Sequence, residues 1–347
     1  MHGVVTAARK RGGTTPASPG FAELRGGDAS AVLVPSLGGK IRDLTLAGRQ
    51  WLWHNAALPF AAPPNGASFA ESGDSGGFDE CFPTVAACRL PSWVKNVGSR
   101  SLPDHGELWS RQPEVVIVTD EHGHSAACAW TGRALPCRFS RKVTVRPDGT
   151  VAFDYAVTNT GDARIPFLWS SHPMFPLTGR TRIVIPQGAR TRVWTQHGVE
   201  LGRPGAEHRW PRLRVGAALV DFSRPAALKQ DFACKLFVEL PRTEVVVALE
   251  ESGVRLEMHL HGRQVPQVGL WINRRGWAPF ATPRSALPPF LRKKAAPYSN
   301  LAIAPCLGAP DTLSDALGAW DAAHWIEAGA TARWSMWWRG VRGNTET

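Results

Sequence analysis

The sequence predicts an all-β protein, a large twisted antiparallel β-sandwich with very little helix. Two observations carry this prediction: many short apolar runs rich in strand-forming residues, and Pro- and Gly-rich turns between them. Only "DTLSDALGAWDAAH" (311–324) has a helical pattern, and it is short. Many strands with almost no helix favour antiparallel sheets that pack face to face.

The clearest element is a hairpin over residues 138–161. Its two strands flank Pro147-Asp148-Gly149, and the Asp-Gly pair supplies the positive φ that a tight turn needs. Earlier strands are expected at 30–39 and 40–48, separated by a Gly-Gly break, and at 114–120 and 125–132. Later strands are expected at "RIVIP" (182–186), "TRVWTQ" (191–196), "KLFVEL" (235–240), "EVVVALEE" (244–251), "VRLEMHLH" (254–261), "QVGLWIN" (267–273), "NLAIAP" (300–305) and "ARWSMWWR" (332–339).

The chain divides into a tail and one large domain. Residues 1–20 are basic and Gly/Pro-rich and contain no apolar segment typical of a secretory signal, so we expect a flexible tail and a cytoplasmic protein. Residues 21–340 form the predicted sandwich domain. Within it, the Pro-rich, basic stretch 278–299 is expected to be an inserted loop and a candidate lid. No apolar run reaches the roughly 18–20 residues that cross a bilayer, so no membrane partner is expected.

Composition favours a small-molecule protein. The net charge is +11, but only eight of the 40 basic residues are lysines and the arginines are spread along the chain. Aromatic-interleaved RNA motifs are missing, so we expect no nucleic-acid partner, although the charge favours anionic ligands. The expected partner is a sugar or a sugar-like small molecule, and the expected assembly is a monomer or a homodimer.

Metal and disulfide chemistry are not expected. The six cysteines are scattered, form no CxxC pair and lie in apolar surroundings, which indicates buried free thiols. His259 and His261 share a strand face, but no third ligand has matching spacing, so we predict no metal and no cofactor.

Three stretches gather groups able to carry chemistry. "GGFDECFPTV" (76–85) contains Asp79 and Glu80, and "LPDHGELW" (102–109) contains Asp104, His105 and Glu107. "FLWSSHPMFPL" (167–177) presents His172 at a predicted strand end before a proline. A loop histidine of this kind can have a near-neutral pKa that suits acid–base catalysis. Each group taken alone equally fits a hydrogen-bonded structural residue or a cap.

Together, and in this order on an all-β chain, these stretches resemble the aldose 1-epimerases, or galactose mutarotase-like proteins. The resemblance runs over most of the chain, from "VLVPSLGGKIRDLTLAGRQWLW" (32–53) through "GLWINRRGW" (269–277) and "NLAIAPCLGAPDTLSDA" (300–316) to "AGATARWSMWWR" (328–339). It implies the galactose mutarotase-like super-sandwich, with a sugar-binding cleft on its concave face.

The resemblance also implies a reaction and its residues. A base removes the proton of the anomeric hydroxyl while an acid protonates the ring oxygen; the ring opens, the aldehyde rotates, and the ring recloses. His172 matches the histidine that acts as the acid, and His105 matches the second histidine of the cleft. The residues expected to contact substrate are Asp79, Glu80, Glu107, Asp231, Trp271 and Ala304.

Ala304 marks a departure from the family. The family's base is a Glu before Pro late in the chain, and this sequence reads "IAPC" at that place. A general base contributes about 10²–10⁴-fold, so its loss should severely reduce ordinary mutarotation. Four groups in the neighbouring motifs are candidates to replace it: Asp104, His105, Glu107 and Cys306.

Three functions therefore stay open. The first is an aldose 1-epimerase-like isomerase that acts on a sugar or sugar-like hemiacetal in carbohydrate metabolism. The second is a cyclase or isomerase of specialised metabolism that reuses the cleft. The fifteen tryptophans and the insertion would suit a larger, more apolar ligand for such an enzyme. The third is a non-catalytic carbohydrate-binding protein. Tryptophans available for stacking on sugar rings are Trp51, Trp53, Trp109, Trp169 and Trp271.

Overall fold

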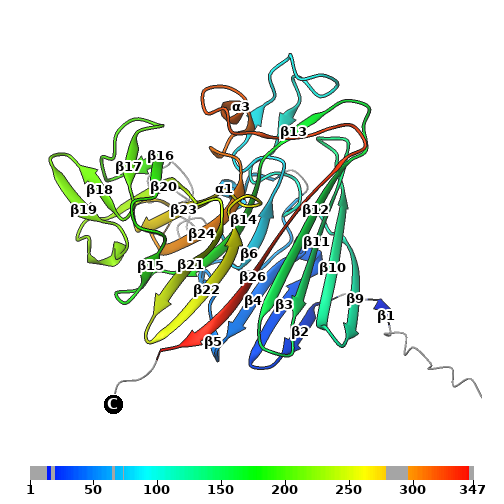
Figure 1. Cartoon of the computed structure of the whole chain (residues 1–347), viewed down its shortest axis with the longest axis horizontal. Coiled ribbons are helices and arrows are strands. Elements are labelled where there is room, and N and C mark those ends of the chain that lie inside the picture. The colour runs from blue at the N-terminus through cyan, green and yellow to red at the C-terminus, as the bar shows by residue number, and fades with distance from the viewer. Residues whose placement is uncertain (1–13, 17–19, 65–66, 73, 279–295, 344–347) are drawn as a thin grey trace, which may run out of the picture.

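Two large antiparallel sheets make up most of the computed structural model (Figure 1). The structure describes residues 14–16, 20–64, 67–72, 74–278 and 296–343. The helices of this part are short: α1 (Phe69–Ser72), α3 (Leu313–Ala316) and two 3₁₀ turns, η1 (Pro35–Leu37) and η2 (Pro225–Ala227). The predicted all-β class and the single short helix within 311–324 are thus confirmed, while α1 was not predicted. No helix of the described residues is long and apolar enough to span a membrane.

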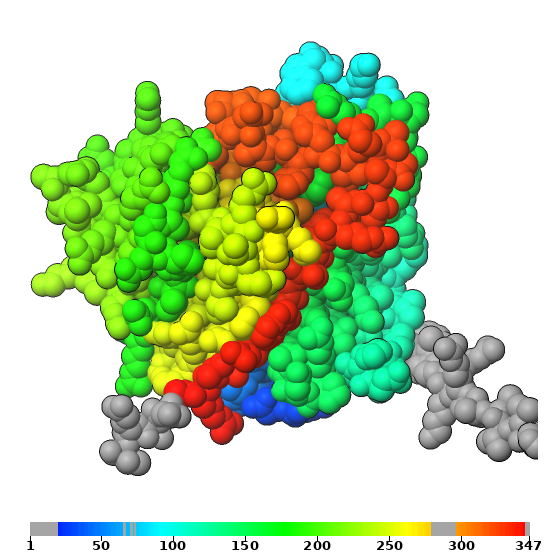
Figure 2. All heavy atoms as spheres, viewed as in Figure 1, coloured from blue at the N-terminus to red at the C-terminus, as the bar shows by residue number. Residues whose placement is uncertain are grey.

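The first sheet has nine strands and contains the predicted hairpin. In β11 and β12, Val145 pairs with Val151 and Cys137 with Asn159, so the turn lies at the Asp-Gly pair as expected. Figure 2 shows β26 (red) running between β22 (yellow) and β12 (green) on this face. The strand order is β1 (Thr14–Pro16), β9 (Glu114–Asp120), β10 (Gly123–Thr131), β11 (Cys137–Val145), β12 (Val151–Asn159), β26 (Thr331–Arg342), β22 (Val254–His261), β21 (Glu244–Glu251) and β15 (Arg182–Val184).

The second sheet has thirteen strands. Its order is β19 (Ala218–Asp221), β18 (Arg212–Val215), β17 (Glu207–Arg209), β16 (Arg190–His197), β20 (Phe232–Glu239), β23 (Gln267–Arg274), β24 (Ser299–Leu307), β14 (Trp169–Pro176), β6 (Phe78–Cys81), β4 (Lys40–Leu46), β3 (Ala29–Val34) and β2 (Ala22–Gly26), with β5 (Arg49–Gln50) on β4. Two small pairs complete the strands: β7 (Cys88–Arg89) with β8 (Ser101–Leu102), and β13 (Ile165–Phe167) with β25 (His324–Ile326).

The core lies between the two sheets. Phe78 of the second sheet packs against Phe153 and Trp338 of the first, with ring centroids 5.6 Å and 5.5 Å apart. Because successive side chains of a strand point to opposite faces, residues next to a core residue face away from the core. Along β6, Phe78 and Glu80 therefore face the core and Asp79 faces the outer side of the second sheet.

Two prolines that were expected to end strands lie inside them. β14 continues through Pro173, and β24 continues through Pro305. The ladder between β14 and β24 pairs Ser170 with Cys306 and resumes at Met174 with Ala302. Proline lacks the N–H that a ladder needs, so the two prolines share one interruption of the ladder instead of breaking each strand. His172 is consequently a strand residue, not the strand-end residue predicted.

The predicted tail and insertion are described only in part. Thr14–Pro16, within the predicted tail, forms β1 and pairs with β9. Residues 279–295 of the predicted insertion, and the remaining residues of the tail before Gly20, lie outside the described part of the chain.

Candidate active site

A cavity of about 320 Å³ lies on the outer side of the second sheet, over strands β14, β16, β20 and β23. In this sheet β16, β20 and β23 are neighbours, and β24 lies between β23 and β14 (Figure 1). Small-molecule sites have cavities of about 300–1,000 Å³, so this one falls at the compact end. The cavity is lined by Phe69, Asp74, Val85, Ala86, Asp104, His105, His172, Met174, Trp194, Thr195, His197, Lys235, Trp271, Trp277, Tyr298 and Asp311.

His172 lies on the cavity side of β14, opposite Asp79 of β6. Its side chain is buried, and its Nδ1 has no hydrogen-bond partner within the described residues. Burial lowers the pKa of His172 well below its usual 6.5, and the positive charges of His105, Lys235 and Lys40 act in the same direction. The ring is therefore a neutral imidazole at neutral pH, not the near-neutral titrating group expected from a loop position.

His105 reaches the same cavity from a tight turn. Its φ is +58°, and the next residue, Gly106, has a φ of +71° and no room for a side chain, since a Cβ there would lie 2.1 Å from the Phe82 carbonyl oxygen. The His105 ring stacks on Phe69 at a centroid distance of 3.9 Å and meets the His172 ring edge-on at 4.9 Å. The turn thus brings together two histidines that are far apart in sequence.

Hydrogen bonds fix the orientation of His105. Its Nδ1 lies 3.1 Å from Asp104 Oδ1, and its backbone N–H donates to the Val85 carbonyl at 2.6 Å. The same segment supplies the N–H groups of Val85 and Ala86, which donate to the Asp311 carbonyl at 2.9 Å and 2.8 Å. One short segment therefore positions both His105 and Asp311 at the cavity.

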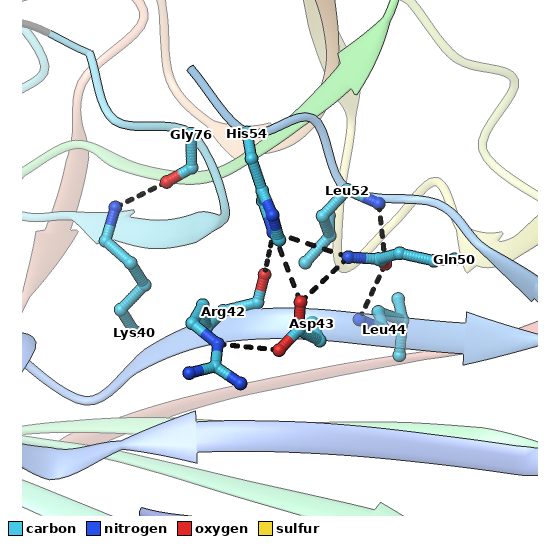
Figure 3. Close-up of polar contacts among 8 residues, drawn as sticks. All are labelled: Lys40, Arg42, Asp43, Leu44, Gln50, Leu52, His54 and Gly76. Carbon is cyan, nitrogen blue, oxygen red and sulfur yellow. Dashed lines mark hydrogen bonds and ion pairs between the residues drawn. The ribbon is translucent and has the colours of Figure 1, made fainter. Parts of the chain in front are cut away.

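A buried polar network lies beside the histidines. Lys40 Nζ donates to the Gly76 carbonyl at 2.6 Å and to Asp79 Oδ2 at 2.7 Å. In Figure 3, Lys40 extends towards Gly76, whereas Asp43 of the same strand joins a separate polar cluster with Gln50 and His54. Asp79, predicted to contact substrate, is thus neutralised by Lys40 next to His172.

Asp74 is the buried carboxyl of the cavity. Its Oδ1 accepts the Gly76 N–H at 2.8 Å, and its Oδ2 accepts from Asn300 Nδ2 at 3.1 Å. Burial raises the pKa of Asp74, and the opposing attraction of Lys40 is smaller. This acid was not singled out in the sequence, because its position in a loop carries no strand pattern.

Aromatic rings form another wall. Trp271, predicted as a substrate contact, lines the cavity, and its Nε1 donates to Asn300 Oδ1 at 3.3 Å. Trp277 packs edge-on against Trp271 at 5.8 Å, and Tyr298 stacks on Trp53 at 5.0 Å. Flat aromatic faces beside hydrogen-bonding groups are suited to a ligand with both apolar and hydroxyl-bearing faces.

Lys235 and Asp311 face the cavity from another side. Lys235 Nζ lies 3.5 Å from Asp311 Oδ1, and both side chains are largely buried. Neither was identified from the sequence. The available signal was a lysine at an alternate position of the apolar strand "KLFVEL", on the face of the sheet that carries Phe237.

Glu80 was expected at the ligand and lies instead in the core. It faces the opposite side of β6 from Asp79, and its carboxylate accepts from Arg141 Nη1 at 3.0 Å, Tyr155 OH at 3.1 Å and Trp169 Nε1 at 2.8 Å. Its partners come from the first sheet and from β14. Glu80 is therefore a structural residue, and its expected role as a ligand contact is corrected.

Glu107 and Asp231 also lie away from the cavity. Glu107 accepts from Arg111 Nη1 at 2.9 Å and from the backbone N–H of Arg133 at 3.0 Å, so it anchors a loop. Asp231 is exposed and pairs with Arg274 and Arg275 on the surface. Neither residue lines the cavity, so this geometry does not support their expected substrate contacts.

Ala304 stands where the resemblance implies a Glu. It is fully buried and pairs with Gly269 of β23. Cys306, two residues on, is a buried thiol whose pKa burial raises to about 12, so it is protonated at neutral pH. All six cysteines are free thiols, and five of them are buried. Within the described residues, no group of three or more His, Cys, Asp or Glu side chains is placed to hold a metal ion.

Comparison of the sequence with protein-family models and with curated proteins finds no match. Solved structures do match, and they define the fold: the chain has the galactose mutarotase-like sandwich fold that the sequence motifs predict. A protein of Synechocystis sp. PCC 6803, Slr1438, superposes with a TM-score of 0.63 at 15% identity, covering 99% of this chain and 100% of its own.

Two further structures carry descriptions of activity. A galactose mutarotase related enzyme from Lactobacillus acidophilus has a TM-score of 0.57 at 15% identity, with 94% of this chain and 99% of its own covered. An aldose epimerase homologue from C. elegans has a TM-score of 0.56 at 11% identity, covering 94% and 100%. At these identities the likeness extends to the fold alone.

Proposed function

We propose that this chain catalyses the opening and closing of a cyclic sugar hemiacetal, as an aldose 1-epimerase-like isomerase of carbohydrate metabolism. The observation that carries the proposal is the pair His105 and His172, with rings 4.9 Å apart in a cavity also lined by Trp271. Titratable and hydrogen-bonding side chains beside an aromatic wall can supply what this reaction needs. The ligand is a small, hydroxyl-rich molecule.

The reaction requires two proton transfers and no change of oxidation state. One group accepts the proton of the anomeric hydroxyl, and a second donates a proton to the ring oxygen as the C1–O bond breaks. His105, oriented by Asp104, would hydrogen-bond the ring oxygen or a neighbouring hydroxyl. Asp74, whose carboxyl accepts from Asn300 Nδ2 at 3.1 Å, lines the same cavity and would contribute an acceptor for a sugar hydroxyl.

The fold supports this proposal without specifying the substrate. Structures described as a galactose mutarotase related enzyme and as an aldose epimerase homologue share the sandwich over more than nine-tenths of this chain. The aromatic wall of Trp271, Trp277 and Tyr298 is consistent with pyranose stacking.

Exchange NMR on freshly dissolved aldoses tests the proposal. We expect the wild-type protein to accelerate interconversion of the anomers of at least one aldose over buffer. His172→Ala should reduce this acceleration by about 10²–10⁴-fold, since it removes one proton-transfer group. His122→Ala, in an exposed turn, is the matched control and should leave the rate unchanged.

Two outcomes would redirect the proposal. Tight sugar binding without any turnover would favour the non-catalytic carbohydrate-binding alternative. A rate that His172→Ala leaves untouched would remove His172 from the reaction.

A further inference from the structure

We propose that Lys235, held by Asp311, is the second proton-transfer group of the cavity and acts in the place that Ala304 leaves without a functional side chain. This inference rests on the proposed function. It assigns a catalytic role to a residue outside the motifs of the sequence resemblance. It pairs Lys235 as proton donor with His172 as proton acceptor, the reverse of the acid role that the resemblance implies for His172.

The register of the second sheet puts Lys235 beside Ala304. Ala304 pairs with Gly269, and Lys235 pairs with Trp271, two residues from Gly269 on the same face of β23. The Lys235 side chain lies across Gly269: a Cβ built on that glycine would be 3.1 Å from Lys235 Nζ. The two small residues thus leave the space that the ammonium group occupies.

The same register brings His172 to this place from the other side. Ser170 pairs with Cys306 and Met174 with Ala302, so His172 lies opposite Ala304 on the cavity face. His172 and Lys235 both line the cavity and flank the small residue at 304. Under this proposal the two groups act on one bound ring from either side of position 304.

The Lys235 ammonium is buried but incompletely partnered. Its exposed fraction is 4%, its carboxylate partner Asp311 Oδ1 is 3.5 Å away, and within the described residues it makes no closer hydrogen bond. Asp311 Oδ1 likewise has no hydrogen-bond partner there. Buried charged groups normally satisfy their hydrogen bonds, so donors left available at a cavity indicate a ligand oxygen as the missing partner.

Lys40 shows what a structural lysine looks like in this site. Its Nζ makes two short hydrogen bonds, to Gly76 at 2.6 Å and to Asp79 at 2.7 Å. Among the residues that the structure describes, Lys235 has neither a carbonyl acceptor nor a short carboxylate contact. The two buried lysines therefore differ in the way expected of a structural and a functional group.

The two thiols and the imidazole near Lys235 are not the proton donor. Cys81 and Cys306 are neutral thiols, since burial raises the pKa of each. His172 is neutral, since burial and the nearby positive charges lower its pKa. A neutral imidazole is a proton acceptor, and Lys235 is the lysine that lines the cavity with it, so we assign Lys235 the donor role.

Ring opening transfers two protons and breaks one C–O bond. His172 takes the proton of the anomeric hydroxyl, the oxygen's electron pair forms the C1 carbonyl, and the bond between C1 and the ring oxygen breaks. The electrons of that bond take the proton of the Lys235 ammonium, which gives an aldehyde, a free hydroxyl, an imidazolium and a neutral amine. After rotation about C1–C2, the amine takes the hydroxyl proton as the ring closes, and the imidazolium returns its proton to the carbonyl oxygen.

Lys235→Met is the first test. In a wild-type protein that accelerates anomer exchange, this variant should lower kcat by about 10²–10⁴-fold with a smaller change in KM. Lys142→Met, at an exposed strand position, is the matched control. Lys235→Met leaves Asp311 as an unpaired buried charge. If the variant is unfolded for this reason, the double variant Lys235→Met/Asp311→Asn, in which both side chains are neutral, is measured in its place.

A charge-retaining variant separates catalysis from packing. Lys235→Arg keeps a positive charge beside Asp311 and a long side chain, but a guanidinium stays protonated and cannot give up its proton. We expect Lys235→Arg to remain folded and to lose kcat about as severely as Lys235→Met. A merely structural lysine would tolerate this change.

The outcomes distinguish the two proposals. A wild-type protein that accelerates no aldose overturns the proposed function and this inference with it. An active wild type whose Lys235→Met variant keeps its kcat within about twofold overturns this inference alone. Loss of activity in Lys235→Met, with a Lys235→Arg variant that keeps its kcat within about twofold of wild type, also counts against it.

Discussion

The carboxylate of Glu80 shows how one position along a strand decides a residue's role. Asp79 and Glu80 are neighbours, yet Asp79 faces the side of the cavity and Glu80 accepts from Arg141, Tyr155 and Trp169 in the core. Burial raises the pKa of Glu80, and the Arg141 guanidinium opposes that shift. Three donors around one buried carboxylate make it a cross-link between the sheets.

Removing this carboxylate should destabilise the fold. We expect Glu80→Ala to lower the free energy of unfolding by about 3–5 kcal/mol, because it leaves the Arg141 guanidinium buried without its ion partner. Urea denaturation measures the change, and the exposed Glu121→Ala should stay within about 0.5 kcal/mol of wild type. A loss below about 1 kcal/mol for Glu80→Ala would contradict the cross-link role.

The burial of His172 makes stability depend on pH. In the unfolded chain this histidine takes up a proton below about pH 6.5, while the folded state keeps it neutral until well below that pH. The free energy of unfolding should therefore fall as the pH drops below 6.5, with a slope from this group of up to about 1.4 kcal/mol per pH unit.

Comparison with His172→Gln isolates this contribution. Denaturation between pH 7.5 and 5.5 should show a shallower loss of stability in the variant, since other histidines with lowered pKa values, His259 and His324, are present in both proteins. Equal slopes in the two proteins would show that His172 is not buried as a neutral ring.

At the scale of elements, the segment 84–86 couples two parts of the site. It binds the backbone of His105 on one side and of Asp311 on the other. Thr84 Oγ1 lies 2.8 Å from the Ala86 carbonyl and 3.1 Å from the Asp311 carbonyl, and it accepts the Leu313 N–H at 3.2 Å. This hydroxyl holds the turn before α3 against the loop that carries His105.

Thr84→Val should loosen that connection while keeping the shape of the side chain. We expect a loss of about 1–3 kcal/mol, because buried backbone groups lose a hydrogen-bond partner. A fall in kcat should accompany it, since His105 and Asp311 are both displaced. The exposed Thr331→Val, in β26, is the comparison, and equal behaviour of the two variants would argue against a coupling role for Thr84.

The elements were largely predictable from sequence, and the exceptions have local causes. Alternating apolar residues and the Asp-Gly turn predicted β11 and β12 correctly. The strand ends at Pro173 and Pro305 were predicted wrongly, because a lost N–H was taken to end each strand. Two strands that place their prolines at the same point of the ladder share a single interruption, and this arrangement is visible only in three dimensions.

At the scale of the whole molecule, the sequence motifs predicted the fold and part of the site. His105, His172 and Trp271 line one cavity, as expected from the resemblance. Glu107 and Asp231 do not, since one anchors a loop and the other lies on the surface. A sequence motif predicts which part of the fold a residue lies in. The direction of its side chain depends on its position along the strand, odd or even, and on the geometry of the turn.

The residues that sequence reasoning missed come from separate strands and loops. Lys235, Asp311, Asp74 and Tyr298 share no motif, and the packing of β14, β20, β23 and β24 brings them to one cavity. Lys235 in particular lies over Gly269 and beside Ala304, two small residues on neighbouring strands. This arrangement depends on the strand register, which the sequence alone does not give.

The central claim is that this cavity opens and closes a sugar ring. Exchange NMR across a panel of aldoses, with wild-type protein and His172→Ala at equal concentration, tests it most directly. We predict faster anomer exchange than in buffer for at least one aldose with the wild type, and a reduction of about 10²–10⁴-fold in the variant. Exchange at the buffer rate for every aldose would contradict the claim.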